Sequence, residues 1–194
     1  AEDSKVLSEH TITVERDQII AIEPGFRQPA ATDTLIDLRQ HTVMPGLMDM
    51  HTHFYTQFSP TVYSEGFTMN EADYALRGAT FAEKTLMAGF TTVRNLGAAG
   101  FADVDLRDAI NAGEIAGPRM RVSGPSLCMT GGHCDNNLLP HIYQASADGV
   151  ANGVDAIRAK VRSNMKYGAD VIKFTATGGV LSRNTDVNAS QYSL

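Results

Sequence analysis

The chain has 194 residues, of which 43% are hydrophobic and 20% charged, with a formal net charge of -6. These values are typical of a globular protein with one domain or slightly more. Lysine and arginine are scattered along the sequence, and no apolar run approaches the roughly 18 residues that span a bilayer. We therefore expect neither nucleic acid nor a membrane as a partner.

The first 45 residues contain three short runs with strand character, separated by turn residues. These runs are residues 11–14, 19–22 and 34–38, and the turns between them are rich in charged residues, proline and glycine. Such a pattern predicts a small antiparallel lobe ahead of the rest of the chain.

From residue 42 onward, apolar strands alternate with helical patterns. We expect strands near residues 42–53, 90–95, 119–123 and 170–175, with helices between them; a capping box at Thr68 and Glu71 opens the first helix. Alternating strands and helices predict a parallel sheet covered by helices, in an α/β fold. A doubly wound sheet and a (β/α)8 barrel both fit, although the sequence lacks the glycine motifs of a nucleotide-binding sheet.

The expected strand at residues 42–53 ends in the sequence MDMHTHF, which carries His51 and His53. Residues i and i+2 of a strand point to the same face, so the two imidazoles project together. Neutral imidazole is the commonest metal-binding side chain, and such a pair is half of a metal site. Two histidines that only form hydrogen bonds at a strand end are the alternative.

Lys173 lies inside the apolar stretch at residues 170–175. A buried ammonium is costly, and burial lowers the lysine pKa and exposes a neutral amine. Beside a metal-binding pair, a neutral amine can take up carbon dioxide and become a carbamate, an anionic ligand that bridges two cations. A lysine paired with a carboxylate is the alternative.

The two cysteines, Cys128 and Cys134, lie six residues apart in a glycine-rich loop. They fit a disulfide, and they fit two free thiols equally well. The compartment stays open between the cytoplasm and, if Ala1 follows a removed signal peptide, the periplasm or the exterior.

Five stretches together resemble the amidohydrolase superfamily: PGLMDMHTHF, AGFTTVRNLG, GPRM, TGGH and GADVIKFTATGGVLS. Within it they are similar to the branch of Xaa-Pro dipeptidases and imidazolonepropionase-like proteins. The resemblance implies a partial (β/α)8 TIM barrel of about four βα units over residues 46–194. It also implies that residues 1–45 are the N-terminal part of a small β-sandwich lobe.

The resemblance implies roles for six residues. His51 and His53 would bind the more buried of two divalent ions, usually zinc, and Lys173 as a carbamate would bridge both. His133 would lie near the substrate, and it would hold a substrate carboxylate or carbonyl together with Tyr143 or Arg183.

The implied function is hydrolysis of amide (C–N) bonds in dipeptides or N-acyl amino acids. The alternatives are a superfamily hydrolase of a lactam, cyclic imide or phosphoester, and an inactive fragment that binds metal or a partner. The family also uses two further histidines and an aspartate, which lie beyond its fourth strand. We therefore expect the N-terminal half of an enzyme, which oligomerises or pairs with a complementing C-terminal half.

Overall fold

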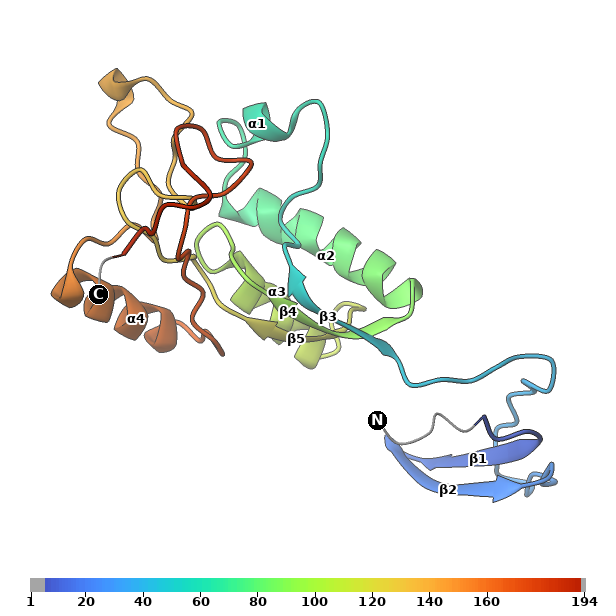
Figure 1. The fold of residues 1–194 in the computed structure, drawn as a ribbon. Helices are drawn as coiled ribbons and strands as arrows, with labels where there is room; N and C mark the ends of the chain where they lie inside the picture. Colours follow the sequence, from blue (N-terminus) through green and yellow to red (C-terminus); the bar gives the residue numbers. More distant parts are fainter. Residues whose placement is uncertain (1–5, 193–194) are drawn as a thin grey trace. The chain divides into compact units, whose positions relative to one another are not determined.

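A computed structural model describes residues 6–192 and divides the chain at Pro45 (Figure 1). The first unit is Ala1–Pro45, and the second unit is Gly46–Leu194. All the residues that the sequence singled out as site candidates belong to the second unit.

The first unit contains one antiparallel hairpin. Strand β1 (His10–Glu15) pairs with strand β2 (Gln18–Pro24), which confirms two of the three predicted strands. The third was wrong: residues 34–38 form no strand, and Ile36 is 73% exposed. A strand needs a partner to satisfy its backbone groups, and this segment pairs with no strand in the described part of the chain.

The second unit is built on a parallel sheet with the order β3-β4-β5. Its strands are β3 (Leu47–Thr52), β4 (Phe90–Asn95) and β5 (Arg119–Val122). They alternate with the helices α1 (Val62–Glu65), α2 (Glu71–Met87), α3 (Ala102–Asn111) and α4 (Val154–Lys166), and a short 3-10 helix, η1 (His141–Tyr143), lies in the loop before α4. The prediction of a parallel α/β sheet is confirmed.

Helices α2 and α3 cover one face of this sheet. Val93 on β4 and Met120 and Val122 on β5 are buried in one cluster with side chains of α2 and α3. Arg94, which follows Val93, and Arg121, which lies between Met120 and Val122, are exposed. Side chains alternate between the faces of a strand, so the sheet has one helix-covered face and one open face.

The fourth predicted strand is reduced to a single bridge between Leu127 and Phe174. The Leu127 amide donates to the Lys173 carbonyl at 2.8 Å, and the Thr175 amide donates to the Leu127 carbonyl at 3.0 Å. Further back, the Val122 amide donates to the Asp170 carboxylate at 3.0 Å. A side chain thus accepts the hydrogen bond that a backbone carbonyl of a neighbouring strand would accept in a regular sheet. The parallel sheet of the second unit thus has three strands, extended by this bridge, where four full βα units were expected.

Helix α2 begins two residues later than predicted. Its N-cap is Asn70, whose side chain accepts from the amides of Ala72 and Asp73, and Asp73 completes the capping box. Thr68 instead donates to the Glu65 carbonyl. Both residue pairs have the capping-box spacing, and asparagine caps at least as well as threonine. Among residues 6–192, no helix combines the length and the apolar character that crossing a bilayer requires.

Candidate metal centre

His51 is the penultimate residue of strand β3, and His53 directly follows the last one, Thr52. Their ring centroids lie 5.3 Å apart, and His53 is the more buried of the two. Gly97 makes room for the second ring, because a Cβ at this position would lie 2.5 Å from Ser126 Oγ and 3.4 Å from the His53 ring. The φ of Gly97, +135°, also favours glycine.

Lys173 reaches the same place from a distant part of the chain. Its Nζ lies 3.4 Å from His51 Nε2, across 122 positions of sequence. Its backbone is held there by the hydrogen bond from the Leu127 amide. None of the ion pairs among residues 6–192 includes Lys173, so the structure does not support a lysine–carboxylate pair.

The electrostatic surroundings favour uncharged nitrogen at all three side chains. Burial, and after it the charge of Lys173, lowers the pKa of His51. Burial is also the main reason that the pKa of His53 is lowered. For Lys173, burial and then the nearby Arg94 guanidinium lower the pKa of the ammonium group. Neutral imidazole and amine nitrogens carry the lone pairs that metal binding requires.

These residues fit a divalent cation as part of a ligand set. The buried Nδ1 of His53 has no hydrogen-bond partner, which a bound ion would supply. Two imidazoles and one amine give three nitrogen donors from two segments. No group of three or more His, Cys, Asp or Glu side chains suited to a metal occurs in the part of the chain that the structure describes. The ligand set is therefore partial.

His133 lies in the long loop after β5 and faces the same region. Burial, followed by the charge of Lys173, lowers its pKa. Its Nδ1 lies within hydrogen-bond distance of Ser182 Oγ, and its ring packs against Gly179, where a Cβ would overlap it. The structure thus places a third imidazole near Lys173.

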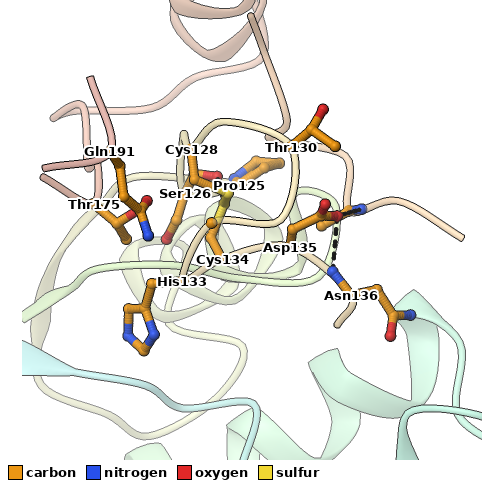
Figure 2. The surroundings of a disulfide bond; sticks show 12 residues. Pro125, Ser126, Cys128, Thr130, His133, Cys134, Asp135, Asn136, Thr175 and Gln191 are labelled. Carbon is orange, nitrogen blue, oxygen red and sulfur yellow. Dashed lines mark hydrogen bonds between the residues drawn. A yellow bond between two sulfur atoms is a disulfide. The ribbon is translucent and has the colours of Figure 1, made fainter. Parts of the chain in front are cut away.

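A disulfide between Cys128 and Cys134 closes the loop that carries His133. Figure 2 shows the His133 ring directed away from the two sulfur atoms. Asp135 holds the same loop: burial raises its pKa, but hydrogen bonds from the Gly131 and Ala147 amides outweigh this and leave it below its ordinary value. Of the two states left open by the sequence, the structure shows the disulfide.

The other two candidate substrate residues lie apart from this group. Tyr143, in η1, is 67% exposed. Arg183 is also exposed. Among residues 6–192, neither side chain forms a hydrogen bond or ion pair with His51, His53 or Lys173. Their assignment to substrate binding stays a prediction.

Sequence reasoning missed Arg94, which lies between Val93 and Asn95 on β4. Its Nε donates to the Met50 carbonyl at 2.8 Å, directly before His51. The signal was available: a cationic side chain inside an apolar strand is as unusual at Arg94 as at Lys173.

A pocket of about 320 Å³ opens beside His53. The ring of Tyr55 lies 5.7 Å from the His53 ring and 5.8 Å from the Tyr74 ring, both edge-on. Both tyrosines line the pocket, together with Tyr63 and Phe67. Tyr55 thus lies between the His53 ring and this aromatic pocket, which neither histidine lines.

A parallel α/β unit that gathers imidazole and amine side chains beside the carboxyl end of strand β3 is arranged like enzymes that place their chemistry at this edge of a parallel sheet. Comparison with known proteins gives the family. The model of the amidohydrolase family matches residues 42–193, and the chain belongs to this family.

Several relatives are similar over most of the chain. Ochratoxinase from Aspergillus niger is 34% identical over an alignment of 176 residues, and the match covers 80% of this chain and 35% of that protein. A crystal structure of a Xaa-Pro dipeptidase with bound methionine in its active site is 36% identical, with a TM-score of 0.88, and the match covers 99% of this chain and 48% of that one.

A prolidase crystallised with N-methylphosphonate-L-proline is 30% identical, with a TM-score of 0.80 over 96% of this chain and 46% of the other. The chain therefore spans between a third and a half of the length of the relatives it matches.

Proposed function

We propose that this chain contributes the first part of the active site of a metal-dependent hydrolase of amide bonds. The observation that carries the proposal is the approach of Lys173 Nζ to 3.4 Å from His51 Nε2, beside the His53 ring. Family membership and the dipeptidase, prolidase and ochratoxinase relatives support hydrolysis of a C–N bond.

In this proposal His51 and His53 hold a divalent cation, of which zinc suits imidazole ligands best. Lys173 is the third ligand. Its neutral amine would take up carbon dioxide with loss of one proton, and the resulting carbamate would supply anionic oxygen ligands. When bound, two cations supply hydroxide near neutral pH and polarise the scissile carbonyl.

The remaining residues act on the substrate. His133 faces the cation ligands from the disulfide-closed loop, and it is held by Ser182, so it is placed to orient a substrate carbonyl or carboxylate. Tyr143 and Arg183 are weaker candidates for the same task, since both are exposed and apart from the histidines. The substrates are dipeptides or N-acyl amino acids, in line with the relatives' names.

Zinc titration and a substrate panel test the proposal together. The chain is stripped of metal, and zinc binding is measured by competition with a chromophoric chelator. We expect binding in the wild type and a loss of roughly 100-fold or more in affinity in His51→Asn and His53→Asn, since each removes a ligand. His141→Asn, in the exposed helix η1, is the matched control.

Turnover is then measured on dipeptides, N-acyl amino acids, a lactam and a phosphoester. Hydrolysis of the first two classes supports the proposal, whereas zinc-dependent turnover of only the lactam or phosphoester would move the assignment to another bond. A protein that binds no zinc would contradict it.

We further infer that the active assembly contains more than one copy of this chain or a complementing C-terminal half. The relatives are two to three times as long as the match. Strand β3 is an edge of its sheet, and the apolar side chains of Met48, Met50 and Phe174 are 41–68% exposed. An open sheet edge with exposed apolar residues favours pairing with further chain.

A further inference from the structure

Strand β3 contains an extra residue next to His51. Asp49 is in register with Val93, and Thr52 is in register with Asn95. Between these pairs β3 has two residues, Met50 and His51, whereas β4 has only Arg94. This is a β-bulge, which is rare between parallel strands and often re-aims a side chain beside an active site.

The extra residue decides which face of the sheet His51 occupies. Val93 and Asn95 are buried under the helices, at 0% and 1% exposure. If the pairing of Asp49 with Val93 continued regularly, Met50 would pair with Arg94 and His51 with Asn95, so His51 would point under the helices. An opposite shift precedes the bulge between Leu47 and Met48, where β4 has the extra residue Thr91, and the bulge offsets that shift by Thr52. The bulge delays the pairing by one residue and leaves His51 on the open face, where Lys173 lies 3.4 Å away.

Two side chains satisfy the backbone groups that lie in the bulge. The Nε–H of Arg94 donates to the Met50 carbonyl at 2.8 Å, and the Asp49 Oδ1 accepts from the His51 amide at 2.9 Å. The regular hydrogen bonding resumes immediately afterwards, with the Leu96 amide donating to the Thr52 carbonyl at 3.0 Å. Strand β3 is at the sheet edge, so no strand on its other side in the described residues could hold the bulge (Figure 1).

From these contacts we propose that Arg94 and Asp49 are positioning residues, which hold the bulge at Met50 and His51 and thereby set the affinity of the site for its cation. The inference rests on the proposed metal site and deepens it. Neither side chain is required to touch the cation. Residues that orient metal ligands typically change metal affinity by roughly 10- to 100-fold when they are replaced.

Replacing Arg94 tests the proposal, because the loss of its charge and the loss of its positioning role would change zinc affinity in opposite directions. Its guanidinium donates to the Met50 carbonyl at 2.8 Å, directly before His51, and a positive charge this near the site repels a cation. If charge alone mattered, Arg94→Met would bind zinc more tightly than the wild type. If Arg94 positions His51, the same change weakens zinc binding, and we expect a loss of roughly 10-fold or more.

Arg119→Met is the matched control for the arginine, because Arg119 lies on β5 and contacts Thr92 rather than β3. For Asp49 the pair Asp49→Asn and Asp49→Ala separates charge from hydrogen bonding. Both variants lose the negative charge, but asparagine keeps an oxygen that can accept from the His51 amide. We expect Asp49→Asn to bind zinc several-fold more tightly than Asp49→Ala.

A second measurement needs no metal. Hydrogen exchange of the His51 amide in the metal-free protein reports the bulge directly, and we expect it to accelerate about tenfold or more in Arg94→Met and Asp49→Ala. Weakened zinc binding with faster exchange supports the proposal. Zinc binding by Arg94→Met equal to or tighter than the wild type, or unchanged exchange, would overturn it. A wild type that binds no zinc contradicts the proposed function itself.

Discussion

Asn95 shows how a single side chain can connect the candidate site to the core. Its Oδ1 accepts from the Phe54 amide at 2.9 Å, directly after His53. Its Nδ2 donates to the Asp103 carboxylate on α3 at 3.1 Å. The same carboxylate accepts from the Ser123 and Gly124 amides at the end of β5. One buried amide thus joins the ends of β3, β4 and β5 to α3.

Replacing Asn95 with alanine should therefore cost stability. The change leaves the Phe54 amide without its partner and removes a donor from a buried carboxylate, and we expect a loss of roughly 2–3 kcal/mol in the free energy of unfolding. Urea denaturation measures it. Asn111→Ala, at the exposed end of α3, is the matched control. An equal effect of the two changes would contradict the role given to Asn95.

At the residue scale, the sequence indicated which side chains meet but not how they are held. The spacing of His51 and His53 on a strand predicted a shared face, and an amine inside an apolar stretch singled out Lys173. The bulge between Asp49 and Thr52 could not be predicted, because it depends on the register with β4. The regular strand assumed from the sequence still gives the correct relation between the two histidines, whose ring centroids lie 5.3 Å apart, although His51 lies in the bulge.

At the element scale, the segment before Lys173 depends on Asp170. Its carboxylate accepts from Arg107 on α3 at 2.8 Å, from Arg121 on β5 at 3.1 Å, and from the Val122 amide at 3.0 Å. Burial raises the pKa of Asp170, but the hydrogen bonds from Arg107 and Val122 outweigh this and leave the pKa below its ordinary value. The ionised form therefore stabilises the folded state.

The stability of the folded state therefore depends on pH in a defined direction. Since the unfolded chain binds this proton more readily, the stabilisation by Asp170 is complete above the ordinary pKa of roughly 4 and is lost as the pH falls through the lowered value. We expect Asp170→Asn to cost roughly 1–3 kcal/mol at neutral pH, and less as the solution is acidified. Denaturation at a series of pH values measures it.

Asp155→Asn is the control, because Asp155 is fully exposed on α4 and pairs only with Arg158, also on α4. We expect no measurable change in stability with this variant at any pH. A constant cost of Asp170→Asn from neutral to acidic pH would show that the carboxylate contributes through its shape rather than its charge.

The disulfide loop is the second element with a measurable consequence. The bond joins two cysteines that lie six positions apart in the sequence. Closing a loop of that length stabilises a fold by about 2 kcal/mol. We expect a reductant to lower the free energy of unfolding by this amount and to loosen His133, which precedes Cys134. The double variant Cys128→Ala/Cys134→Ala should not respond to the reductant. Two titratable thiols with unchanged stability would contradict the prediction.

The elements that the sequence predicted best are those with a strong local pattern. Helices α3 and α4 and strands β4 and β5 lie where apolar periodicity predicted them. The fourth strand failed, because its pairing depends on a distant loop and on the Asp170 side chain. The start of α2 was missed because two overlapping residue pairs have the same capping spacing. The sequence could not decide the disulfide, because a separation of six positions suits both the bonded and the free cysteines.

At the scale of the whole molecule, the second unit exposes more apolar surface than its core covers. Its buried core contains seven side chains, whereas Met48 is 68%, Leu76 73% and Phe174 58% exposed. We expect the 20.9 kDa chain to assemble or to recruit a complementing polypeptide. Sedimentation equilibrium across a range of concentrations measures this, and a well-folded monomer at every concentration would contradict it.

In the proposed site, imidazole nitrogens of His51 and His53 and a carbamate oxygen on Lys173 share one cation. A crystal of the zinc-loaded protein, measured with X-rays on both sides of the zinc absorption edge, tests it most directly. We expect an anomalous peak about 2.0–2.1 Å from one imidazole nitrogen of His51 and of His53, with carbamate density on Lys173. Zinc bound elsewhere, with no peak between these rings, would contradict the account.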